Sequence, residues 1–275
     1  MKPSRAIALT IAGSDSSGGA GIQADIKTFS AFGVYGASVI TALTAQNTMG
    51  VAGILSTPPD FITAQLDAVA SDLAIAAVKT GMLGTRAAVE AVADGLTRHK
   101  LSRVIVDPVM IASSGDVLID DDAIDALRLR LIPLAVLITP NLPEAARLLD
   151  TSAARDIAEM EAQARALQTR FMARNVLLKG GHGTGNHAVD LLLTGGKAIF
   201  HSRPRLDVTN THGTGCTLSA AIAALLALDV SLNEAVARAK AFVWNALEAG
   251  CTHGVGHGRG PLDHLYHVRR DDPPA

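Results

Sequence analysis

The chain has 275 residues, with 24 Lys and Arg against 26 Asp and Glu, so its formal net charge is −2 at pH 7. Hydrophobic residues make up 48% of it and charged residues 18%, which excludes a long disordered chain. Because there is no basic excess and only 3% of residues are aromatic, we expect no nucleic-acid partner.

The first half of the chain alternates apolar strand patterns with amphipathic helix patterns. The strand at 6–12 is apolar at nearly every position, which is typical of a strand buried on both faces. The helix that follows places Ile22, Ile26 and Phe29 on one face, and Gly33 is its expected C′ residue. This half predicts strands at 6–12, 37–45, 74–79 and 103–107, and helices at 22–32, 58–73, 85–100 and 121–131.

The second half continues the alternation and ends in two long helices rich in Ala and Leu. It predicts strands at 135–139 and 175–179, a hairpin of 188–194 and 197–202 around Gly195 and Gly196, and helices starting near 144 and 156 and spanning 213–228 and 232–249. Strand–helix alternation of this kind favours an α/β fold, with a parallel sheet covered on both faces. We expect a single domain over 1–270 and a frayed tail at 271–275.

Cysteine usage and hydropathy bear on location. Cys216 and Cys251 cannot build a disulfide framework, and neither belongs to a CxxC motif, so a reducing cytoplasm is the simpler assumption. No stretch approaches the roughly 20 apolar residues of a membrane span. We therefore expect a soluble, cytoplasmic protein with no membrane partner.

Polar residues follow the expected strands at one consistent position. In an open α/β sheet, ligands bind outside the carboxyl ends of the strands. Any one polar residue there has a simple reading as a loop residue, but six such segments in register indicate a site. The segments are 13–15, 46–47, 79–82, 107–109, 141–144 and 179–182.

The strongest single motif is the glycine-rich turn TNTHGTGCTLS at 209–219, which opens directly into an apolar helix. The first amides of a helix lack internal partners and carry partial positive charge, so this turn is suited to a phosphate group. The alternative is a tight loop whose glycines meet only steric needs. A Walker A loop is excluded, since Gly19 and Ala20 stand where Lys and Ser or Thr are required.

Seven segments together resemble one family, the hydroxymethylpyrimidine/phosphomethylpyrimidine kinases of thiamine biosynthesis, within the ribokinase-like superfamily. They occur in the family's order over almost the whole chain: AGSDSSGGAGIQADIKTF, ITALTAQNT, KTGML, VDPVM, TPNLPE, LLKGGH and TNTHGTGCTLSAA. The departures are Thr44, where an aliphatic residue is common, and the ending GHGRGPLDH. The resemblance implies a three-layer α/β/α fold with a mostly parallel central sheet.

The resemblance also implies an activity: ATP- and Mg²⁺-dependent phosphorylation of 4-amino-5-hydroxymethyl-2-methylpyrimidine, then of its monophosphate to the diphosphate. Gly213, Thr214, Gly215 and Cys216 would form the anion hole for the transferred group, and Lys179 and Asn141 would serve the nucleotide phosphates. Asp107 and Glu144 follow strands and would hold Mg²⁺, partly through water.

For the pyrimidine, the resemblance implies that Gln46 pairs with the aminopyrimidine edge, because its amide both donates and accepts. The flat ring would be lined by Gly13, Ala20, Met82 and Val109, for which ordinary core packing is the alternative. Asp15 would contact the ring or a lid.

Cys216 stands where related sugar kinases usually carry an Asp base. A thiol at a helix N-terminus can have a lowered pKa, so we expect Cys216 to accept the hydroxyl proton; the alternative is an inert buried cysteine. Segments 15–20 and 111–116 are candidate lids that would exclude water. The family resemblance suggests a homodimer.

Two other functions compete with this hypothesis. A pyridoxal or pyridoxine kinase shares the fold and, in one branch, the GTGC motif. A non-catalytic pyrimidine or nucleotide sensor belongs to a different class, but the joint presence of Asp107, Glu144, Lys179 and the glycine turn disfavours it. Turnover assays on the two alcohols would separate the kinases, and substrate-dependent ATP consumption would exclude the sensor.

Overall fold

The computed structural model describes residues 5–111, 115–181, 185–252 and 254–268 of the chain. The tail expected at 271–275 lies outside these residues, as does the middle of the expected lid at 111–116. Among the described helices, none combines the length and the apolar content that crossing a membrane requires.

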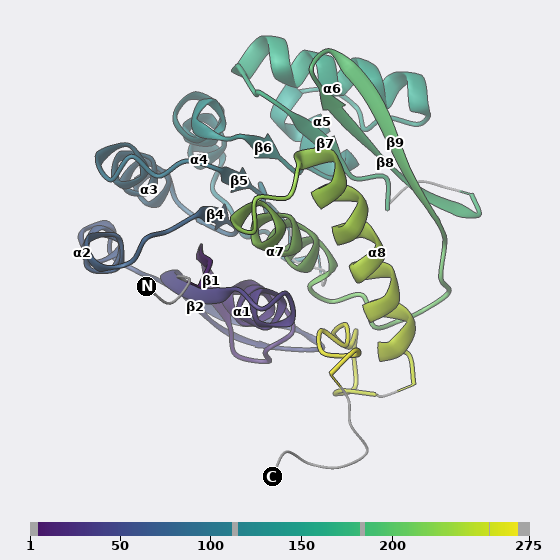
Figure 1. The fold of residues 1–275 in the computed structure, drawn as a ribbon, viewed down its shortest axis with the longest axis horizontal. Helices are drawn as coiled ribbons and strands as arrows, with labels where there is room; N and C mark the ends of the chain where they lie inside the picture. Colours follow the sequence, from purple (N-terminus) through teal and green to yellow (C-terminus); the bar gives the residue numbers. More distant parts are fainter. Residues whose placement is uncertain (1–4, 112–114, 182–184, 253, 269–275) are drawn as a thin grey trace.

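One sheet runs through the described residues (Figure 1). Its spatial order is β3-β2-β1-β4-β5-β6-β7-β8-β9. Strands β2, β1, β4, β5, β6 and β7 pair with one another in parallel. Strand β3 pairs antiparallel with β2, and β8 pairs antiparallel with β7 and β9, so the expected mostly parallel sheet is confirmed. The strands are β1 (Ile7–Asp15), β2 (Tyr35–Asn47), β3 (Gly50–Ser56), β4 (Ala77–Thr80), β5 (Val104–Val106), β6 (Leu137–Ile138), β7 (Val176–Leu178), β8 (His187–Thr194) and β9 (Lys197–Pro204).

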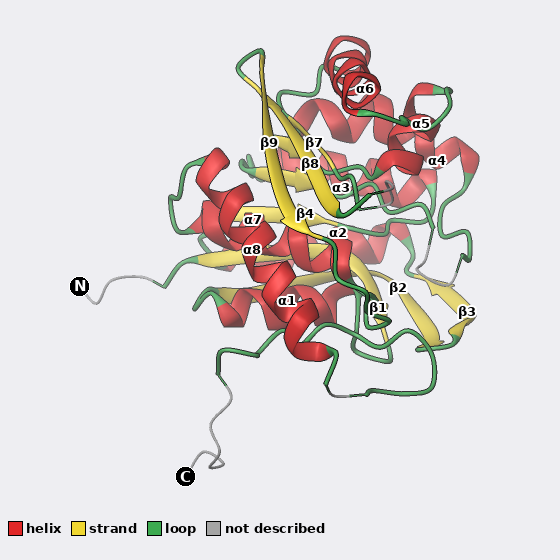
Figure 2. Cartoon of the chain, turned by 90° about the vertical axis from the view of Figure 1, so that its right-hand side faces the viewer, coloured by secondary structure: helices red, strands yellow, loops and turns green. Residues whose placement is uncertain are grey.

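Helices cover both faces of this sheet, as the turned view in Figure 2 shows. Helices α1, α7 and α8 pack on one face, and α2 to α6 lie on the other. The helices are α1 (Gly21–Ala31), α2 (Pro59–Asp72), α3 (Arg86–Arg98), α4 (Asp121–Ala126), α5 (Leu142–Leu149), α6 (Ile157–Phe171), α7 (Thr214–Ala227) and α8 (Leu232–Gly250). The expected three layers are therefore present.

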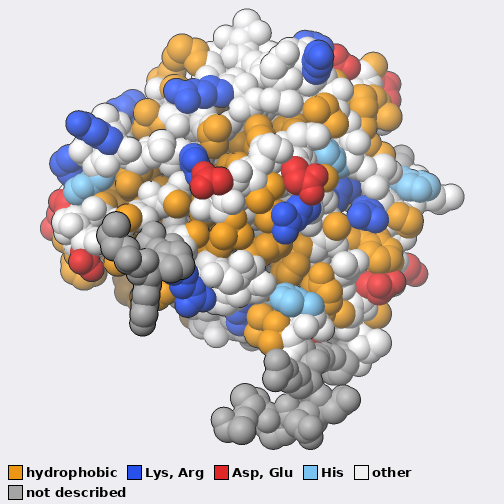
Figure 3. Space-filling view, viewed as in Figure 1, with side chains coloured by type: hydrophobic (Ala, Val, Ile, Leu, Met, Phe, Trp, Pro, Cys, Tyr) orange, Lys and Arg blue, Asp and Glu red, His pale blue; other side chains and the backbone are white. Residues whose placement is uncertain are grey.

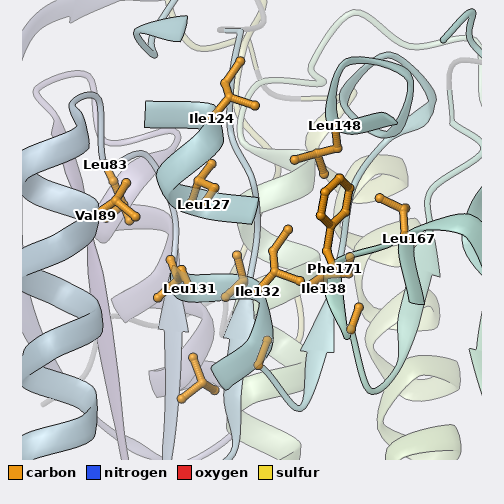
Figure 4. Packing of buried hydrophobic residues seen from close by; sticks show 14 of the residues in the cluster. Leu83, Val89, Ile124, Leu127, Leu131, Ile132, Ile138, Leu148, Leu167 and Phe171 are labelled. Carbon is orange, nitrogen blue, oxygen red and sulfur yellow. The ribbon is translucent and has the colours of Figure 1, made fainter. Parts of the chain in front are cut away.

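The strands supply both hydrophobic cores, because alternate side chains of a strand point to opposite faces. In β5, Val104 and Val106 belong to the core under α2 to α6, and Ile105 belongs to the core under α1, α7 and α8. Figure 4 shows part of the first core, where Phe171 of α6 packs beside Leu148 of α5. Burial on both faces explains why these strands lack polar alternation.

Two elements differ from the sequence expectation. Strand β3 is not predicted, because most of its residues are exposed at the edge of the sheet and leave no alternating pattern. The helix predicted at 121–131 is α only as far as Ala126; a π-helical turn (Leu127–Leu131) and a 3-10 turn (Ile132–Leu134) follow. Pro133 lies in the 3-10 turn and has no amide proton, so it cannot continue the hydrogen bonding of the preceding helical turns.

A fully buried ion pair joins β4 to α1 beneath the carboxyl edge of the sheet. Lys79 Nζ lies 2.9 and 2.8 Å from the two Asp25 carboxylate oxygens, and Thr10 donates to the same carboxylate at 2.6 Å. Both charged residues are 0% exposed. Burial alone lowers the pKa of Lys79, but the attraction of Asp25, together with that of Cys216 and Asp107, outweighs burial and raises the pKa above its ordinary value. Lys79 is therefore charged and depends on Asp25 for its neutralisation.

We predict that Lys79→Met lowers the free energy of unfolding by about 3–5 kcal/mol, because it leaves the buried Asp25 without its counter-charge. Urea unfolding measures the loss. Combining Lys79→Met with Asp25→Asn should recover part of it, since neither charge is then stranded. Strictly additive losses in the double variant would contradict this interpretation.

Candidate active site

A cavity of about 760 Å³ opens at the carboxyl ends of the parallel strands. It is where the sheet topology places ligands in an open α/β fold. The site residues expected from the sequence all line it: Gly13, Asp15, Ala20, Gln46, Met82, Asp107, Val109, Asn141, Glu144, Lys179, Gly213, Thr214, Gly215 and Cys216. The structure thus brings together in one cavity residues from distant parts of the chain.

The glycine turn at the start of α7 faces a charged pair. Gly213 has φ +82° at the N-cap, and a Cβ there would lie 1.9 Å from the carbonyl oxygen of Gly19, so only glycine fits. A Cβ on Gly215 would lie 3.3 Å from Lys179 Nζ and 3.7 Å from Asp107 Oδ2. The positive end of α7 therefore opens onto the space beside these two side chains.

Asp107 directly follows β5, and three side chains donate hydrogen bonds to its carboxylate. Its carboxylate accepts from Lys179 Nζ at 2.8 Å, from Thr139 at 3.0 Å and from Ser219 at 3.1 Å. Burial alone raises the pKa of Asp107, but Lys179 and Lys79 outweigh it and hold the pKa below its usual value. Asp107 is therefore an ionised carboxylate at the base of the cavity.

Glu144, in the first turn of α5, lies on the other side of Lys179. Its Oε2 is 3.9 Å from Lys179 Nζ, and it closes a capping box in which it accepts from the Asn141 amide at 2.7 Å and donates its own amide to Asn141 Oδ1 at 2.9 Å. Burial raises the pKa of Glu144 to about 7, a rise that Lys179 opposes and Asp107 adds to. Lys179 thus stands between two acidic groups.

This donor set fits Mg²⁺. No group of three or more His, Cys, Asp or Glu side chains that could hold a metal ion occurs among the described residues, so Asp107 and Glu144 are considered as a pair of carboxylates. Mg²⁺ keeps several waters and is commonly held by one or two carboxylates together with substrate phosphates. Two buried carboxylates beside an anion-binding turn have that chemistry.

The expected low pKa of Cys216 is contradicted. Burial raises the pKa of the thiol to about 11, although Lys79 and a hydrogen bond from the Gly21 amide act in the opposite direction. The helix N-terminus is the only influence on this thiol that is visible in the sequence. Desolvation of the thiol is not visible there, because it depends on how α7 packs against the rest of the chain.

The residues expected to line a flat ring converge from four strand ends. Gly13 packs against Met82, whose sulfur would lie 3.2 Å from a Cβ at that glycine. Gln46 is fixed through its backbone, because the Ser16 hydroxyl donates to Gln46 O at 2.8 Å and accepts from Gln46 N at 2.9 Å. These contacts give the cavity a narrow wall with one side-chain amide at its edge.

The Asp15 carboxylate accepts several hydrogen bonds within the loop between β1 and α1. It accepts from Ser17, from the Gly19 and Ala20 amides at 3.1 and 2.8 Å, and from His212 Nε2 at 2.8 Å. Burial raises its pKa, but the His212, Ser17 and Ala20 hydrogen bonds outweigh burial and lower the pKa to about 2. With both oxygens engaged, Asp15 fixes the 15–20 segment, which the sequence analysis considered as a lid.

Sequence reasoning missed His212 and a second buried ion pair. His212 is 5% exposed and packs against Gly19, where a Cβ would meet its ring at 2.4 Å. At the outer end of the cavity, Lys240 of α8 donates to Asp190 of β8 at 2.6 Å, and Asp190 also accepts from the Gly180 amide at 2.9 Å. An acidic residue inside the apolar run VDLLL was the available signal for Asp190.

Comparison with known proteins agrees with this geometry. The family described as "Phosphomethylpyrimidine kinase" matches residues 15–263. A hydroxymethylpyrimidine/phosphomethylpyrimidine kinase of Rhizobium meliloti is 53% identical over 266 residues, which cover 97% of this chain and 99% of that protein. A thiamine biosynthesis bifunctional protein of Geobacter sulfurreducens is 51% identical over 263 residues, covering 95% of this chain and 52% of that protein.

Among solved structures, the ADP complex of Bacillus subtilis pyridoxal kinase is similar with a TM-score of 0.89. The two sequences are 35% identical, and the match covers 97% of this chain and 100% of that one. The fold is therefore the ribokinase-like fold that the sequence motifs implied.

The hydrogen bonds to the Asp15 carboxylate should make the stability of the fold depend on pH. Because the pKa of Asp15 in the folded state lies near 2, below its ordinary value of 3.8, its ionised form stabilises the fold above about pH 4. That stabilisation, about 2 kcal/mol by linkage, is lost as the pH falls toward 2. Asp15→Asn should therefore be less stable than the parent at pH 7, with the difference shrinking between pH 4 and pH 2.

Unfolding by urea at a series of pH values measures this difference. Asp72→Asn, at the exposed end of α2, is the control for removal of one carboxylate. An Asp15→Asn deficit that stays constant down to pH 2 would show that the ionised form is not what stabilises the loop.

Proposed function

The chain belongs to the phosphomethylpyrimidine kinase family, and we propose that it transfers the γ-phosphoryl group of ATP to 4-amino-5-hydroxymethyl-2-methylpyrimidine and then to the resulting monophosphate. Such a phosphotransferase would act in thiamine biosynthesis, the process for which the Geobacter sulfurreducens relative is named. The observation that carries the proposal is the position of Lys179 and Asp107, directly beside Gly215 at the start of α7.

Phosphoryl transfer requires positioning and charge neutralisation more than covalent participation by the protein. The amides at 213–216 and the dipole of α7 would hold the transferred group from one side. Lys179 would neutralise phosphate oxygens, since its ammonium already faces that space. Asn141, at the cap of α5, lines the same wall of the cavity.

Asp107 and Glu144 would hold Mg²⁺, partly through water, and the ion would neutralise charge on the ATP phosphates. Asp107 is ionised and fixed by Thr139 and Ser219, so its position does not depend on the ion. Glu144 is anchored by its capping box. Both carboxylates are therefore preorganised for a cation bound next to Lys179.

The acceptor alcohol would lie between the ring wall and Cys216. The Gln46 amide would pair with the aminopyrimidine edge, and Gly13, Ala20, Met82 and Val109 would enclose the ring. Cys216 would accept the hydroxyl proton as a thiolate, with its charge offset by Lys79 and the Gly21 amide. Because the pKa of the thiol is about 11, only a small fraction would be ionised at neutral pH.

A pyridoxal kinase is the second candidate, because the B. subtilis pyridoxal kinase has a TM-score of 0.89 with this chain. Sequence identity favours the hydroxymethylpyrimidine kinase, because it is 53% to the Rhizobium kinase and 35% to the pyridoxal kinase. Parallel assays with ATP, Mg²⁺ and either alcohol, followed by mass spectrometry, would decide. We expect one and then two phosphates on the hydroxymethylpyrimidine; turnover of pyridoxal alone would contradict the proposal.

We further propose a cytoplasmic enzyme with small-molecule substrates. Both cysteines are free thiols, which suits a reducing compartment. On the face seen in Figure 3, Lys and Arg are interspersed with Asp and Glu instead of forming a basic field, which disfavours a nucleic-acid partner.

A homodimer would cover the exposed edge of the sheet. On the β2–β3 hairpin, Leu43 and Leu55 are paired in register and are 49% and 67% exposed. Phe61 of α2 is 59% exposed. An exposed edge strand with apolar side chains is ordinarily covered by another chain or carries features that block pairing with one. A second copy of this chain is the partner that the family resemblance suggests.

We predict that Cys216→Ala lowers kcat by roughly a hundred-fold or more, as loss of a proton acceptor does, with little change in KM for the pyrimidine. The parent kcat should rise between pH 7 and pH 9 as the thiolate fraction grows, and the variant should lose this rise. Gly215→Val should be worse, because its side chain would enter the space in front of Lys179. Steady-state kinetics measures both effects, with Cys251→Ala as the control; an unchanged kcat in Cys216→Ala would defeat the proton-acceptor role.

We predict that Leu55→Asp converts a dimer to a monomer without unfolding it, because the charge would be buried at the interface. Sedimentation velocity measures the mass. Leu129→Asp, on the exposed turn after α4, is the matched control and should remain dimeric. A monomeric parent protein, or a dimeric Leu55→Asp variant, would exclude the β2–β3 edge as the interface.

A further inference from the structure

The side-chain amide of Gln46 lies between a threonine hydroxyl and a histidine ring nitrogen. Thr44 Oγ1 lies 3.1 Å from Gln46 Oε1, and His212 Nε2 lies 3.5 Å from Gln46 Nε2. The backbone of Gln46 is fixed by Ser16. The last side-chain bond is still able to turn, and a half-turn exchanges the positions of Oε1 and Nε2.

His212 cannot accept a hydrogen bond from Gln46 through Nε2. That nitrogen is 2.8 Å from Asp15 Oδ2, and the pKa of Asp15 is lowered to about 2, so Asp15 is an ionised acceptor. His212 Nε2 must therefore carry the proton that it donates to Asp15. If the Gln46 NH₂ group faces His212 Nε2, two hydrogen-bond donors point at each other and no hydrogen bond forms between them.

Thr44 has one hydroxyl proton and two acceptors within reach. Its Oγ1 lies 2.9 Å from the Ser14 carbonyl oxygen and 3.1 Å from Gln46 Oε1, and Thr44 is only 8% exposed. If the proton goes to Ser14, Gln46 Oε1 loses its partner, and if it goes to Gln46, the Ser14 carbonyl loses it.

A half-turn of the Gln46 amide removes both conflicts. Gln46 Nε2 then donates to Thr44 Oγ1, Thr44 donates to Ser14, and Gln46 Oε1 faces the N–H of His212. One N–H of Gln46 is used by Thr44, and the carbonyl oxygen with the adjacent N–H forms an edge open to a ligand. That edge matches a ring held with its amino group toward Gln46 Oε1 and its unprotonated ring nitrogen toward Nε2.

We propose that Thr44 sets the orientation of the Gln46 amide and thereby makes the pocket selective for a 4-aminopyrimidine over its 4-oxo analogue. Held in the same placement, the oxo ring presents the reversed pattern, a carbonyl acceptor toward Oε1 and an N–H donor toward Nε2. To pair with it, Gln46 must turn back, and the single hydroxyl proton of Thr44 then leaves either Gln46 Oε1 or the Ser14 carbonyl without a partner. This inference rests on the proposed function, since it concerns the same acceptor site.

The test compares kcat/KM for the 4-amino alcohol and its 4-oxo analogue in three proteins: the parent, Thr44→Val and Thr44→Ser. Thr44→Val keeps the branched shape and removes the hydroxyl, whereas Thr44→Ser keeps the hydroxyl. We expect the parent to prefer the amino ring and Thr44→Val to reduce that preference about five-fold, the effect of one neutral hydrogen bond. The change should be in KM and not in kcat, and Thr44→Ser should keep the parental preference.

Three outcomes would overturn the proposal: an unchanged preference in Thr44→Val, an equal loss on both rings, or the same reduction in Thr44→Ser. The equal loss is what a merely structural role through Ser14 produces. Thermal melting checks that each variant folds, and Thr44→Ala replaces Thr44→Val if the latter does not. A parent protein that phosphorylates neither ring contradicts the proposed function itself; calorimetric binding of the two rings by the parent and Thr44→Val then tests the selectivity separately.

Discussion

The Lys179 ammonium is the charge on which the site depends. It lies 2.8 Å from Asp107 and 3.9 Å from Glu144, and it faces Gly215 at the positive end of α7. Burial would lower the pKa of this lysine, but the two carboxylates outweigh burial and raise it. A permanent cation between two acids, next to unpaired helix amides, provides a place for a phosphoryl group and for the metal ion that accompanies nucleotide phosphates.

Close backbone packing holds that arrangement in place. The turn that begins α7 fits against the loop that begins α1 only because Gly213 meets Gly19 without a side chain between them. Asp15 and His212 join the same two segments by a hydrogen bond. The loop before α1 and the turn that begins α7 are therefore parts of one packed unit.

Much of the fold and the candidate site could be predicted from the sequence, because the determining patterns are local. Apolar strands followed by polar residues located the cavity, and the turn at 213–216 identified its anion-binding end. Contacts between distant residues could not be predicted: the Lys79–Asp25 pair spans 54 positions, and the pKa of Cys216 depends on desolvation by the surrounding fold. Strand β3 left no pattern, since its exposed residues face solvent on the edge of the sheet.

The central claim is that the turn at 213–216 and Lys179 together hold the phosphoryl group in transit. A crystal structure of the protein with ADP, Mg²⁺, aluminium fluoride and the hydroxymethylpyrimidine tests it most directly, because the fluoride complex imitates the transferred group. We expect the fluoride complex within hydrogen-bonding distance of the amides at 213–216 and of Lys179 Nζ, in line with the ring's hydroxymethyl oxygen. A fluoride complex bound elsewhere, with that turn covered by protein side chains, would contradict it.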